Sequence, residues 1–306
     1  MNGISVIIPT LNRVDCLLDT VGYILSQDFK YPYEIIIVDQ SQQVNQMMIG
    51  MEQNNQAIIK YHHITCFKGL PEARNYGAQC ARYDYILYLD DDIECNENLL
   101  AEHYKYISQQ HIGIVAGGIT EKYKENPKSR NTGVFHFFSA TPERGFHLMK
   151  NGYVDHAGGG NYSIKRDVFY KVGGVDEYLN VGAALYEETD ICLRVKKSGY
   201  KVFFNYNAHI WHLAAPKGGC RVLDIEKYIY ALVHNRSIII HRYLNRYQRL
   251  TAYFVLVKLV LSYMLAYKNS SLFKVFRKAY TEGRQKASMP PKVTNYRQWK
   301  SPSING

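Results

Sequence analysis

The chain has 306 residues, of which 46% are hydrophobic and 21% are charged. This is the composition of a globular protein, and it excludes a disordered chain, a collagen-like repeat and a small disulfide-stapled protein. The formal net charge of +10 is unevenly distributed, because residues 1–214 carry 20 basic and 24 acidic side chains, whereas residues 215–306 carry 17 basic and 3 acidic ones. The strongly basic last segment indicates contact with an anionic surface, either nucleic acid or anionic lipid.

The cysteines and the first residues bear on the cellular compartment. Six cysteines are scattered along the chain without a CxxC pair, as in proteins of a reducing cytosol. The start of the sequence lacks a basic region and a small-residue cleavage site, so we expect no signal peptide. The longest apolar stretch, residues 252–267, is interrupted by Lys258 and is shorter than the roughly 20 residues of a membrane-spanning helix. We therefore predict a cytoplasmic protein.

Short β-rich runs alternate with helical patterns along the first 120 residues. Helical spacing of apolar residues separates predicted strands and covers residues 16–25, 70–82 and 96–110. Such βαβ units imply an α/β fold with a mostly parallel central sheet flanked by helices. Because ligands bind at the carboxyl ends of such strands, we expect the chemistry near Asp39 and residues 90–92. The strands, which are apolar and β-branched, are predicted at residues 4–9, 34–39, 57–64, 84–90 and 112–119.

The second half of the chain is less regular. Residues 121–152 are rich in Lys, Asn and Arg and predict a long loop or lid. Two further strands are predicted at residues 158–164 and 201–208, and apolar residues recur at helical spacing over residues 224–287. The polar, proline-bearing segment 289–306 predicts a loose tail.

Three adjacent carboxylates, Asp90, Asp91 and Asp92, follow the predicted strand at residues 84–90. Like charges held this close raise one another's pKa, and a solvated acidic turn would tolerate them. The alternative is a divalent-cation site, because carboxylate oxygens are the hard ligands that magnesium and manganese prefer. The residues alone leave both interpretations open.

A second acidic group, Glu187, Glu188 and Asp190, opens a helical pattern. The helix dipole favours acidic side chains in a first turn, which accounts for all three without any function. Alternatively, one of them is a general base that faces a substrate hydroxyl. His209 and His212 lie farther along the chain, and this pair is either structural or a source of metal ligands.

Seven sequence elements occur in the order typical of family 2 glycosyltransferases of the GT-A fold, and the chain resembles that family over about residues 3–220. The resemblance implies a GT-A catalytic domain at 1–220, with a nucleotide-sugar-binding half at 1–119 and an acceptor and catalytic half at 120–220. A basic amphipathic helical extension at 221–288 is expected to follow it. The elements are 5–13 (SVIIPTLNR), 34–41 (EIIIVDQS), 68–75 (KGLPEARN), 89–93 (LDDDI), 159–164 (GGNYSI) with 173–177 (GGVDE), 187–194 (EETDICLR) and 211–212 (WH).

The resemblance assigns the donor side of the site mainly to the first half of the chain. It implies that Asp92 and His212 hold Mn2+ or Mg2+, which neutralises the leaving diphosphate of a nucleotide sugar. It also implies nucleotide-sugar contacts for Pro9, Thr10, Asn12, Arg13, Asp39, Lys68, Gly69, Arg74, Asn75, Asp90 and Asp91.

The acceptor side is implied to lie in the second half. Glu188 matches the catalytic base of the family, although the family usually has Asp at this position. The extra methylene moves the carboxylate by about 1 Å, and a displacement of that size affects rates strongly. Glu187 and Asp190 therefore stay open as alternative bases. The acceptor itself is expected at Gly159, Gly160 and Asn161.

The resemblance implies a metal-dependent inverting glycosyltransferase. We expect it to move a sugar from a nucleotide sugar, by default a UDP-sugar, to a hydroxyl of a saccharide or lipid-linked acceptor in cell-surface polysaccharide biosynthesis. A nucleotidyltransferase could also use paired acids and magnesium, but it does not need the acidic group at 187–190. A nucleic-acid-binding protein could use the basic segment 215–306, but carboxylates repel a phosphate backbone, so we expect no nucleic-acid partner.

The basic extension contains an apolar helical stretch at 251–267. Thr251, Lys258 and Ser262 lie near one narrow polar stripe, apolar residues cover the rest, and Arg and Lys residues flank the stretch. A basic helix with a broad apolar face is typical of interfacial membrane helices. We therefore predict peripheral binding to an anionic membrane surface, at the inner face of the cell membrane. The alternative is a helix that packs its apolar face on the catalytic domain.

Overall fold

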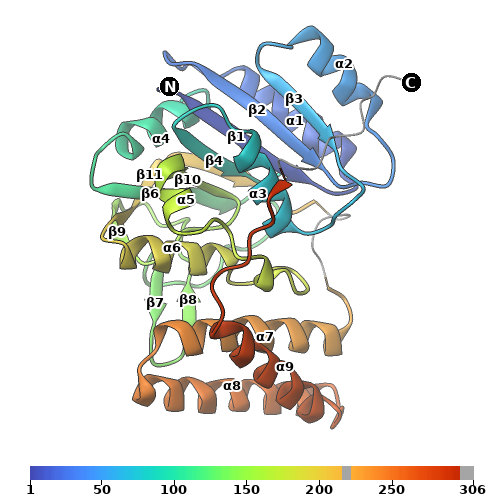
Figure 1. The fold of residues 1–306 in the computed structure, drawn as a ribbon, viewed down its shortest axis with the longest axis vertical. Coiled ribbons are helices and arrows are strands. Elements are labelled where there is room, and N and C mark those ends of the chain that lie inside the picture. Colours follow the sequence, from blue (N-terminus) through green and yellow to red (C-terminus); the bar gives the residue numbers. More distant parts are fainter. Residues whose placement is uncertain (216–221, 297–306) are drawn as a thin grey trace.

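A nine-stranded sheet forms the centre of the protein (Figure 1). The structure is a computed structural model that describes residues 1–215 and 222–296, so the predicted domain boundary at residue 220 and the tail beyond Tyr296 lie outside the described residues. The strands are β1 (Ile4–Thr10), β2 (Tyr33–Asp39), β3 (Ile59–His63), β4 (Tyr85–Leu89), β5 (Ile93–Cys95), β6 (Ile112–Glu121), β9 (Gly152–Val154), β10 (Asn161–Lys165) and β11 (Lys201–His212).

The strand order is β3-β2-β1-β4-β10-β6-β11-β5, and β9 pairs with the N-terminal part of β11, at residues 202–204. Strands β3, β2, β1 and β4 are parallel to one another, and β6 is parallel to β11. Strand β10 is inserted antiparallel between β4 and β6, and β5 and β9 are also antiparallel to their neighbour. The predicted α/β class with a mostly parallel sheet is therefore confirmed.

Helices cover both faces of the sheet, as the continuously apolar strands require. Ile7 and Ile8 are neighbours in β1, yet each is fully buried in a different hydrophobic cluster. The cluster around Ile8 is covered by α1 (Val14–Leu25), α2 (Gln46–Asn54) and α4 (Leu99–Ile107). The cluster around Ile7 is covered by α3 (Leu70–Cys80), α5 (Arg166–Lys171) and α6 (Glu187–Lys197).

The predicted loop or lid at residues 121–152 contains a small hairpin, β7 (Val134–His136) and β8 (Thr141–Glu143). Its strands are only three residues long, which is too short to produce an alternating pattern in the sequence. Phe135 and Ala140 of this hairpin are buried against the C-terminal helices. The segment is thus partly structured, and it joins the sheet to the helical layer below it in Figure 1.

Three helices, α7 (Ile225–Tyr243), α8 (Arg246–Ala266) and α9 (Leu272–Ala287), form that layer at the end of the molecule opposite to β3 and α2 (Figure 1). The predicted helical character of residues 224–287 is confirmed. Helix α8 begins with a capping box, in which the Asn245 side chain accepts from the Gln248 backbone and the Gln248 side chain accepts from the Asn245 backbone. The cap defines the start of α8 at Arg246, close behind the end of α7 at Tyr243.

The prediction of a loose tail is wrong for residues 289–296. Thr294 donates its backbone N–H and its hydroxyl to the carboxylate of Glu177, and the Tyr296 hydroxyl donates to the same carboxylate at 2.9 Å. The Tyr296 ring is buried and contacts Phe67, with 4.6 Å between ring centroids. Glu177 is a buried carboxylate that needs donors, and this distant segment supplies them.

Candidate active site

Two cavities open at the carboxyl edge of the parallel strands and share one wall. The first has a volume of about 220 Å³ and the second about 510 Å³. Leu70, Asp90 and His212 line both of them. The neighbouring parallel strands β1, β2 and β4 all end at this edge, where ligands bind in open α/β sheets.

The second cavity is lined by seven of the residues that were predicted to contact a nucleotide sugar. Its basic side chains are the exposed Lys68 and the largely buried Arg13, which is ion-paired with Asp91 at 2.7 Å and with Asp92 at 3.1 Å. Gly69 has φ +145°, a conformation that favours glycine, and a Cβ there would overlap the side chains of Asn180 and Glu72. The seven residues are Pro9, Thr10, Arg13, Lys68, Gly69, Asp90 and Asp91.

Asp91 organises the wall of this cavity. Thr10 donates its hydroxyl to one carboxylate oxygen of Asp91 at 2.6 Å, and Arg13 donates Nη1 to the other at 2.7 Å. Burial raises the pKa of Asp91 to about 6, although the charge of Arg13 and the Thr10 hydrogen bond oppose the shift. The Asp91 carboxylate therefore orients the Arg13 guanidinium in the wall of the cavity, where Asp92 Oδ2 lies 3.1 Å from the same Nη1.

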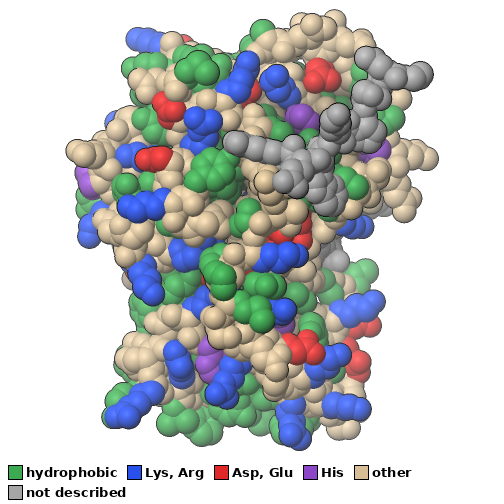
Figure 2. All heavy atoms as spheres, viewed as in Figure 1, with side chains coloured by type: hydrophobic (Ala, Val, Ile, Leu, Met, Phe, Trp, Pro, Cys, Tyr) green, Lys and Arg blue, Asp and Glu red, His purple; other side chains and the backbone are tan. Residues whose placement is uncertain are grey.

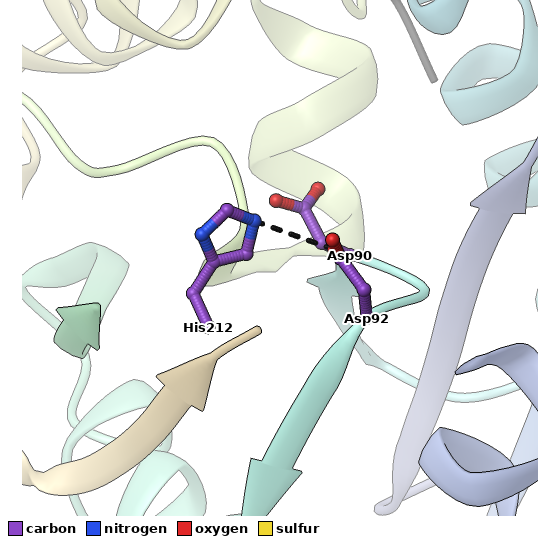
Figure 3. Close-up of side chains that lie close together, drawn as sticks. All are labelled: Asp90, Asp92 and His212. Carbon is purple, nitrogen blue, oxygen red and sulfur yellow. Dashed lines mark ion pairs between the residues drawn. The ribbon is translucent and has the colours of Figure 1, made fainter. Parts of the chain in front are cut away.

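Asp90, Asp92 and His212 form a cluster between the two cavities (Figure 3). The two carboxylates follow β4, the histidine ends β11, and one potential ligand atom of each lies within 4.8 Å of the others. His212 Nε2 lies 3.3 Å from Asp92 Oδ1, while its Nδ1 is hydrogen-bonded to Glu121 at 3.0 Å. The Glu121 bond fixes the ring so that Nε2 faces the carboxylates.

The residues of this cluster fit a hard divalent cation. Apart from its contact with His212, the buried Asp92 Oδ1 has no hydrogen-bond partner among residues 1–215 and 222–296. Two carboxylates with one imidazole are a donor set that suits Mn2+ or Mg2+. Burial would lower the pKa of His212, but the hydrogen bond and charge of Asp92 outweigh it and raise the pKa to about 9. The same negative charge that stabilises a proton on Nε2 would stabilise a metal ion that replaces that proton.

The first cavity is lined by Gly159 and Gly160, the predicted acceptor residues, and by two of the three candidate bases. Gly160 lets the chain pass close to Asp90, since a Cβ there would overlap the Asp90 carboxylate. Glu188 is half-buried, faces the cavity, and has no hydrogen bond or ion pair with any described residue. Its carboxylate is thus available to a substrate hydroxyl.

Glu187 also borders the first cavity, but its carboxylate is already paired. It forms an ion pair with Arg74, and both side chains are almost fully buried. Arg74 also donates Nη2 to the carbonyl of Gly159 at 2.6 Å. Arg74, which was predicted to contact the nucleotide sugar, therefore lines the first cavity rather than the second and neutralises Glu187.

Asp190 lines neither cavity, contrary to the expectation that it could be the base. Its fully buried carboxylate accepts hydrogen bonds from Arg194 at 2.8 Å, Tyr243 at 2.7 Å and Arg242 at 3.1 Å. Burial would raise the pKa of Asp190, but the charges of Arg194 and Arg242 outweigh it and hold the pKa below its usual value. Asp190 joins α6 to α7 instead of facing a substrate.

Two residues at strand ends and loops also lie outside the cavities. The carboxylate of Asp39 is buried and accepts hydrogen bonds from the Tyr61 hydroxyl at 2.7 Å and the Ser41 backbone at 2.9 Å. Asn12 has φ +56° and donates its backbone N–H to Ser41. Both shape the loops after β1 and β2, so their predicted contact with a nucleotide is not seen in the lining of the cavity.

Two predicted asparagines are structural as well. Asn75 is buried and exchanges hydrogen bonds with the backbone of Val175 at 2.8 and 2.9 Å. Asn161 is buried and donates to the carbonyls of Gly118 and Ala208, at 3.0 and 2.8 Å. Each satisfies backbone groups beneath the site, and neither lines the two cavities described above, so their expected nucleotide and acceptor contacts stay predictions.

Sequence reasoning missed several residues that line the cavities. Gln40 and Asn180 line the second cavity, and Asn126, Arg144 and His147 line the first. Gln40 directly follows a predicted strand, so its position at the strand end could have indicated it. The others lie in irregular segments, whose path across the site no periodic pattern predicts.

Comparison with known proteins agrees with this geometry. A family model described as Glycosyl transferase family 2 matches residues 5–173. The poly(ribitol-phosphate) beta-N-acetylglucosaminyltransferase TarP of Staphylococcus aureus is 26% identical over 133 residues, which are 42% of this chain and 41% of TarP. A glucosyl-dolichyl phosphate glucuronosyltransferase of Haloferax volcanii is 24% identical over 227 residues, 68% of each chain. The chain thus spans less than half of the length of TarP.

Solved structures show the same fold. The chain is similar to S. aureus TarS 1–349 in complex with UDP-GlcNAc, with a TM-score of 0.64, 13% identity, and coverage of 94% of this chain and 81% of that one. It is also similar to GalNAc-T7 with UDP, GalNAc and Mn2+, with a TM-score of 0.61, 19% identity, and coverage of 78% and 50%. The fold is therefore the GT-A fold. Because the family model matches more than half of the chain, the protein belongs to glycosyl transferase family 2.

Proposed function

We propose that this protein is a metal-dependent, inverting glycosyltransferase that moves a sugar from a nucleotide sugar to a hydroxyl of a saccharide or lipid-linked acceptor. The observation that carries the proposal is the shared wall of the two cavities. One cavity contains the unpaired carboxylate of Glu188, the other contains Arg13 and Lys68, and Asp90 and His212 line both. A base and a set of cations thus face one another across a cluster that fits a metal ion.

On the donor side, the chain offers positive charge to a diphosphate. Arg13 is held by Asp91 at 2.7 Å, and the exposed Lys68 ammonium lines the same cavity. Asp92 and His212, with Asp90, are the residues that would hold Mn2+ or Mg2+. When bound there, such an ion supplies Lewis-acid stabilisation of the leaving diphosphate.

On the acceptor side, Glu188 removes the proton from the attacking hydroxyl. The hydroxyl oxygen forms a bond to the anomeric carbon while the bond from that carbon to the diphosphate breaks, and the electron pair leaves with the nucleoside diphosphate. Attack opposite to the leaving group inverts the configuration. Because Arg74 neutralises Glu187, only one uncompensated carboxylate of α6 faces the acceptor.

The names of the relatives support the substrate classes. TarS was crystallised with UDP-GlcNAc and GalNAc-T7 with UDP and Mn2+, which supports a UDP-sugar donor and a manganese ion. TarP is named for a poly(ribitol-phosphate) acceptor, and the Haloferax volcanii relative is named for a glucosyl-dolichyl phosphate acceptor. We propose that the acceptor here is likewise part of a cell-surface polymer or a lipid-linked sugar.

A thermal-shift panel of nucleotide sugars tests the donor assignment. In the presence of MnCl2, we expect UDP-sugars to raise the melting temperature, because a ligand at 100 times its Kd stabilises the native state by about 2.7 kcal/mol. GDP- and dTDP-sugars at the same concentration serve as controls, since a mannosyltransferase of this fold was crystallised with GDP-Man and Mn2+. Stabilisation by none of these donors would contradict the proposed function.

We further propose that α8 and α9 bind the cytoplasmic surface of an anionic membrane. Helix α8 has 21 residues, and its most apolar 18-residue window has a mean hydropathy of 1.5, so by length and composition it could cross a membrane. It is longer than the apolar stretch seen in the sequence because the helix begins six residues before that stretch. Ala252, Leu256 and Val260 pack against the other helices of the layer, whereas only 17% of its most apolar window is buried. Because one side of α8 packs against α7 and α9, we propose that α8 lies in the plane of the membrane surface and does not cross the bilayer.

The outward face of this layer combines apolar and basic side chains, which gather at the lower end of the molecule in Figure 2. The exposed large hydrophobic residues of α8 are Tyr247, Leu250, Phe254, Val255, Leu261 and Leu265. The exposed basic residues of α8, α9 and the turn between them are Arg246, Lys258, Lys268, Lys274, Arg277, Lys278 and Arg284. Apolar side chains gain by entering a bilayer and lysines by meeting anionic headgroups, whereas an exposed phenylalanine and leucines contribute nothing to phosphate contacts with nucleic acid.

Replacing two exposed apolar residues of α8 with glutamate tests the membrane proposal. We expect the double variant Phe254→Glu and Leu261→Glu to lose at least 10-fold in its partition onto phosphatidylglycerol vesicles, because burying each apolar side chain contributes about 1.5 kcal/mol or more. Met149→Glu is the matched control, since Met149 is an apolar residue that is 79% exposed and belongs to a loop outside the C-terminal helices. Equal sedimentation of the double variant and wild type would refute docking, and wild type that resists alkaline carbonate extraction would instead indicate a crossing helix.

A further inference from the structure

The segment that leads into α6 is held by one side chain of the C-terminal layer. Asn235 of α7 is fully buried, and its amide nitrogen donates to the carbonyl of Leu179 at 2.9 Å and to that of Leu185 at 3.0 Å. Both donors of the amide are thus used to bridge the two ends of residues 179–185. Among the residues that the structure describes, Asn235 is the side chain that hydrogen-bonds to these two carbonyls.

The bridged segment borders both cavities. Asn180 and Gly182 line the second cavity, whereas Ala183, Ala184 and Leu185 line the first. The segment then passes directly into α6, whose first two residues are Glu187 and Glu188. Its position therefore sets where the Glu188 carboxylate lies relative to the donor and acceptor sides.

The backbone of this segment is strained. Ala184 has φ +50° and Tyr186, the residue before α6, has φ +73°. Non-glycine residues in the left-handed region cost of order 1–3 kcal/mol each and persist only when the surroundings hold them. Here the surroundings are α7, because Tyr186 is buried in the cluster formed with the C-terminal helices and Asn235 holds the Leu185 carbonyl between the two strained residues.

A second contact from α7 reaches the first turn of α6. The Tyr243 hydroxyl and the Arg242 guanidinium hydrogen-bond to the Asp190 carboxylate, at 2.7 and 3.1 Å. Helix α7 therefore fixes both the strained entry and the first turn of the helix that carries Glu188. The acidic first turn is anchored on one side while Glu188 stays free on another.

We infer that Asn235 is a positioning residue for glycosyl transfer, acting on Glu188 through the carbonyls of Leu179 and Leu185. This rests on the proposed function, and it extends that function by making the basic C-terminal helices part of the catalytic apparatus. Asn235 lines neither of the two cavities. It holds the strained segment in the one arrangement that points the base into the acceptor cavity.

The test compares two buried hydrogen-bonding residues of α7 in the full-length protein. Asn235→Ala removes the bridge, and we expect kcat of transfer to fall about 10- to 100-fold, because a displacement of about 1 Å at a catalytic group has effects of that size. Donor affinity, measured as the thermal shift by the UDP-sugar with MnCl2, is expected to fall much less than kcat, because Asn180 and Gly182 are only two of the residues that line the donor cavity. Ser237→Ala is the matched control, since Ser237 is equally buried but donates to Tyr280 of α9 at 2.8 Å; its kcat is expected to be unchanged.

The milder Asn235→Ser, which keeps one donor, is expected to lower kcat less and provides a measurement if Asn235→Ala does not fold. Unchanged kcat in the folded Asn235 variants, or an equal loss of kcat in Ser237→Ala, would overturn the positioning role. A loss of donor affinity in parallel with kcat would also overturn it, because general loosening of the fold would then explain the effect. If wild type shows no transfer with any donor, the proposed function fails instead, so the two failures are distinguishable.

Discussion

Glu188→Gln is expected to lower kcat of glycosyl transfer by about 10²- to 10⁴-fold, the range over which a positioned general base contributes. The amide cannot accept the proton of the acceptor hydroxyl, although its shape is nearly the same. Glu188 has no hydrogen bond or ion pair with any described residue, so we expect the melting temperature and the donor-induced thermal shift to stay at wild-type values. The measurement is single-turnover transfer with saturating donor.

Glu187→Gln provides the contrast, because it breaks the buried ion pair with Arg74. Removing one partner of such a pair typically costs about 3–5 kcal/mol, so we expect this variant to melt at a clearly lower temperature. The two neighbouring glutamates should therefore fail for different reasons, one in the reaction and the other in the fold. Transfer by Glu188→Gln at a rate close to that of wild type would show that another group is the base.

Asp92→Asn is expected to remove the response to manganese and to reduce transfer by at least about 100-fold, since a lost metal ligand weakens both metal affinity and activity. The substitution keeps the size of the side chain but removes the charge that faces His212 at 3.3 Å. The direct measurement is the thermal shift as MnCl2 is added without any donor. A readout without substrate separates metal binding from catalysis.

Glu94→Gln is the control for this experiment. Glu94 lies two residues beyond Asp92, but its carboxylate pairs with the surface residue Lys122 at 2.6 Å, away from the cluster. Surface pairs of this kind contribute about 0–1 kcal/mol, so we expect an unchanged manganese response. A manganese shift of wild-type size in Asp92→Asn would contradict the assignment of Asp92 as a ligand.

The choice among the three acids of α6 shows where sequence reasoning stops. Successive helical residues point about 100° apart, so Glu187, Glu188 and Asp190 face three directions, and each direction meets different partners. Glu187 meets Arg74 of α3, and Asp190 meets Arg242 of α7. Neither partner lies near the acids in the sequence, so no local pattern could predict which carboxylate stays free.

Predicted residues whose polar groups are already hydrogen-bonded follow the same rule. Asp39 ends a predicted strand, as expected, but Tyr61 of β3 and the following turn use both oxygens of its carboxylate. The tail was predicted to be loose because of its polar composition, yet Thr294 and Tyr296 donate hydrogen bonds to the buried Glu177 carboxylate. The composition of a segment does not show which residues elsewhere in the chain it will contact. The contacts of Asp39 and of the tail are made with such distant residues.

The sequence by itself determined the α/β class and the position of the Asp90–Asp92 run at a strand end, because continuous apolar runs and helical spacing are local properties. It also determined that a basic helical segment with a broad apolar face lies at residues 224–287. Only the tertiary structure decided that Glu188 is the unpaired acid, that Asp92 and His212 meet, and that α7 clamps the entry to α6 through Asn235. These depend on contacts between residues far apart in the sequence, where burial and pairing, not local pattern, determine which side chains stay available for chemistry.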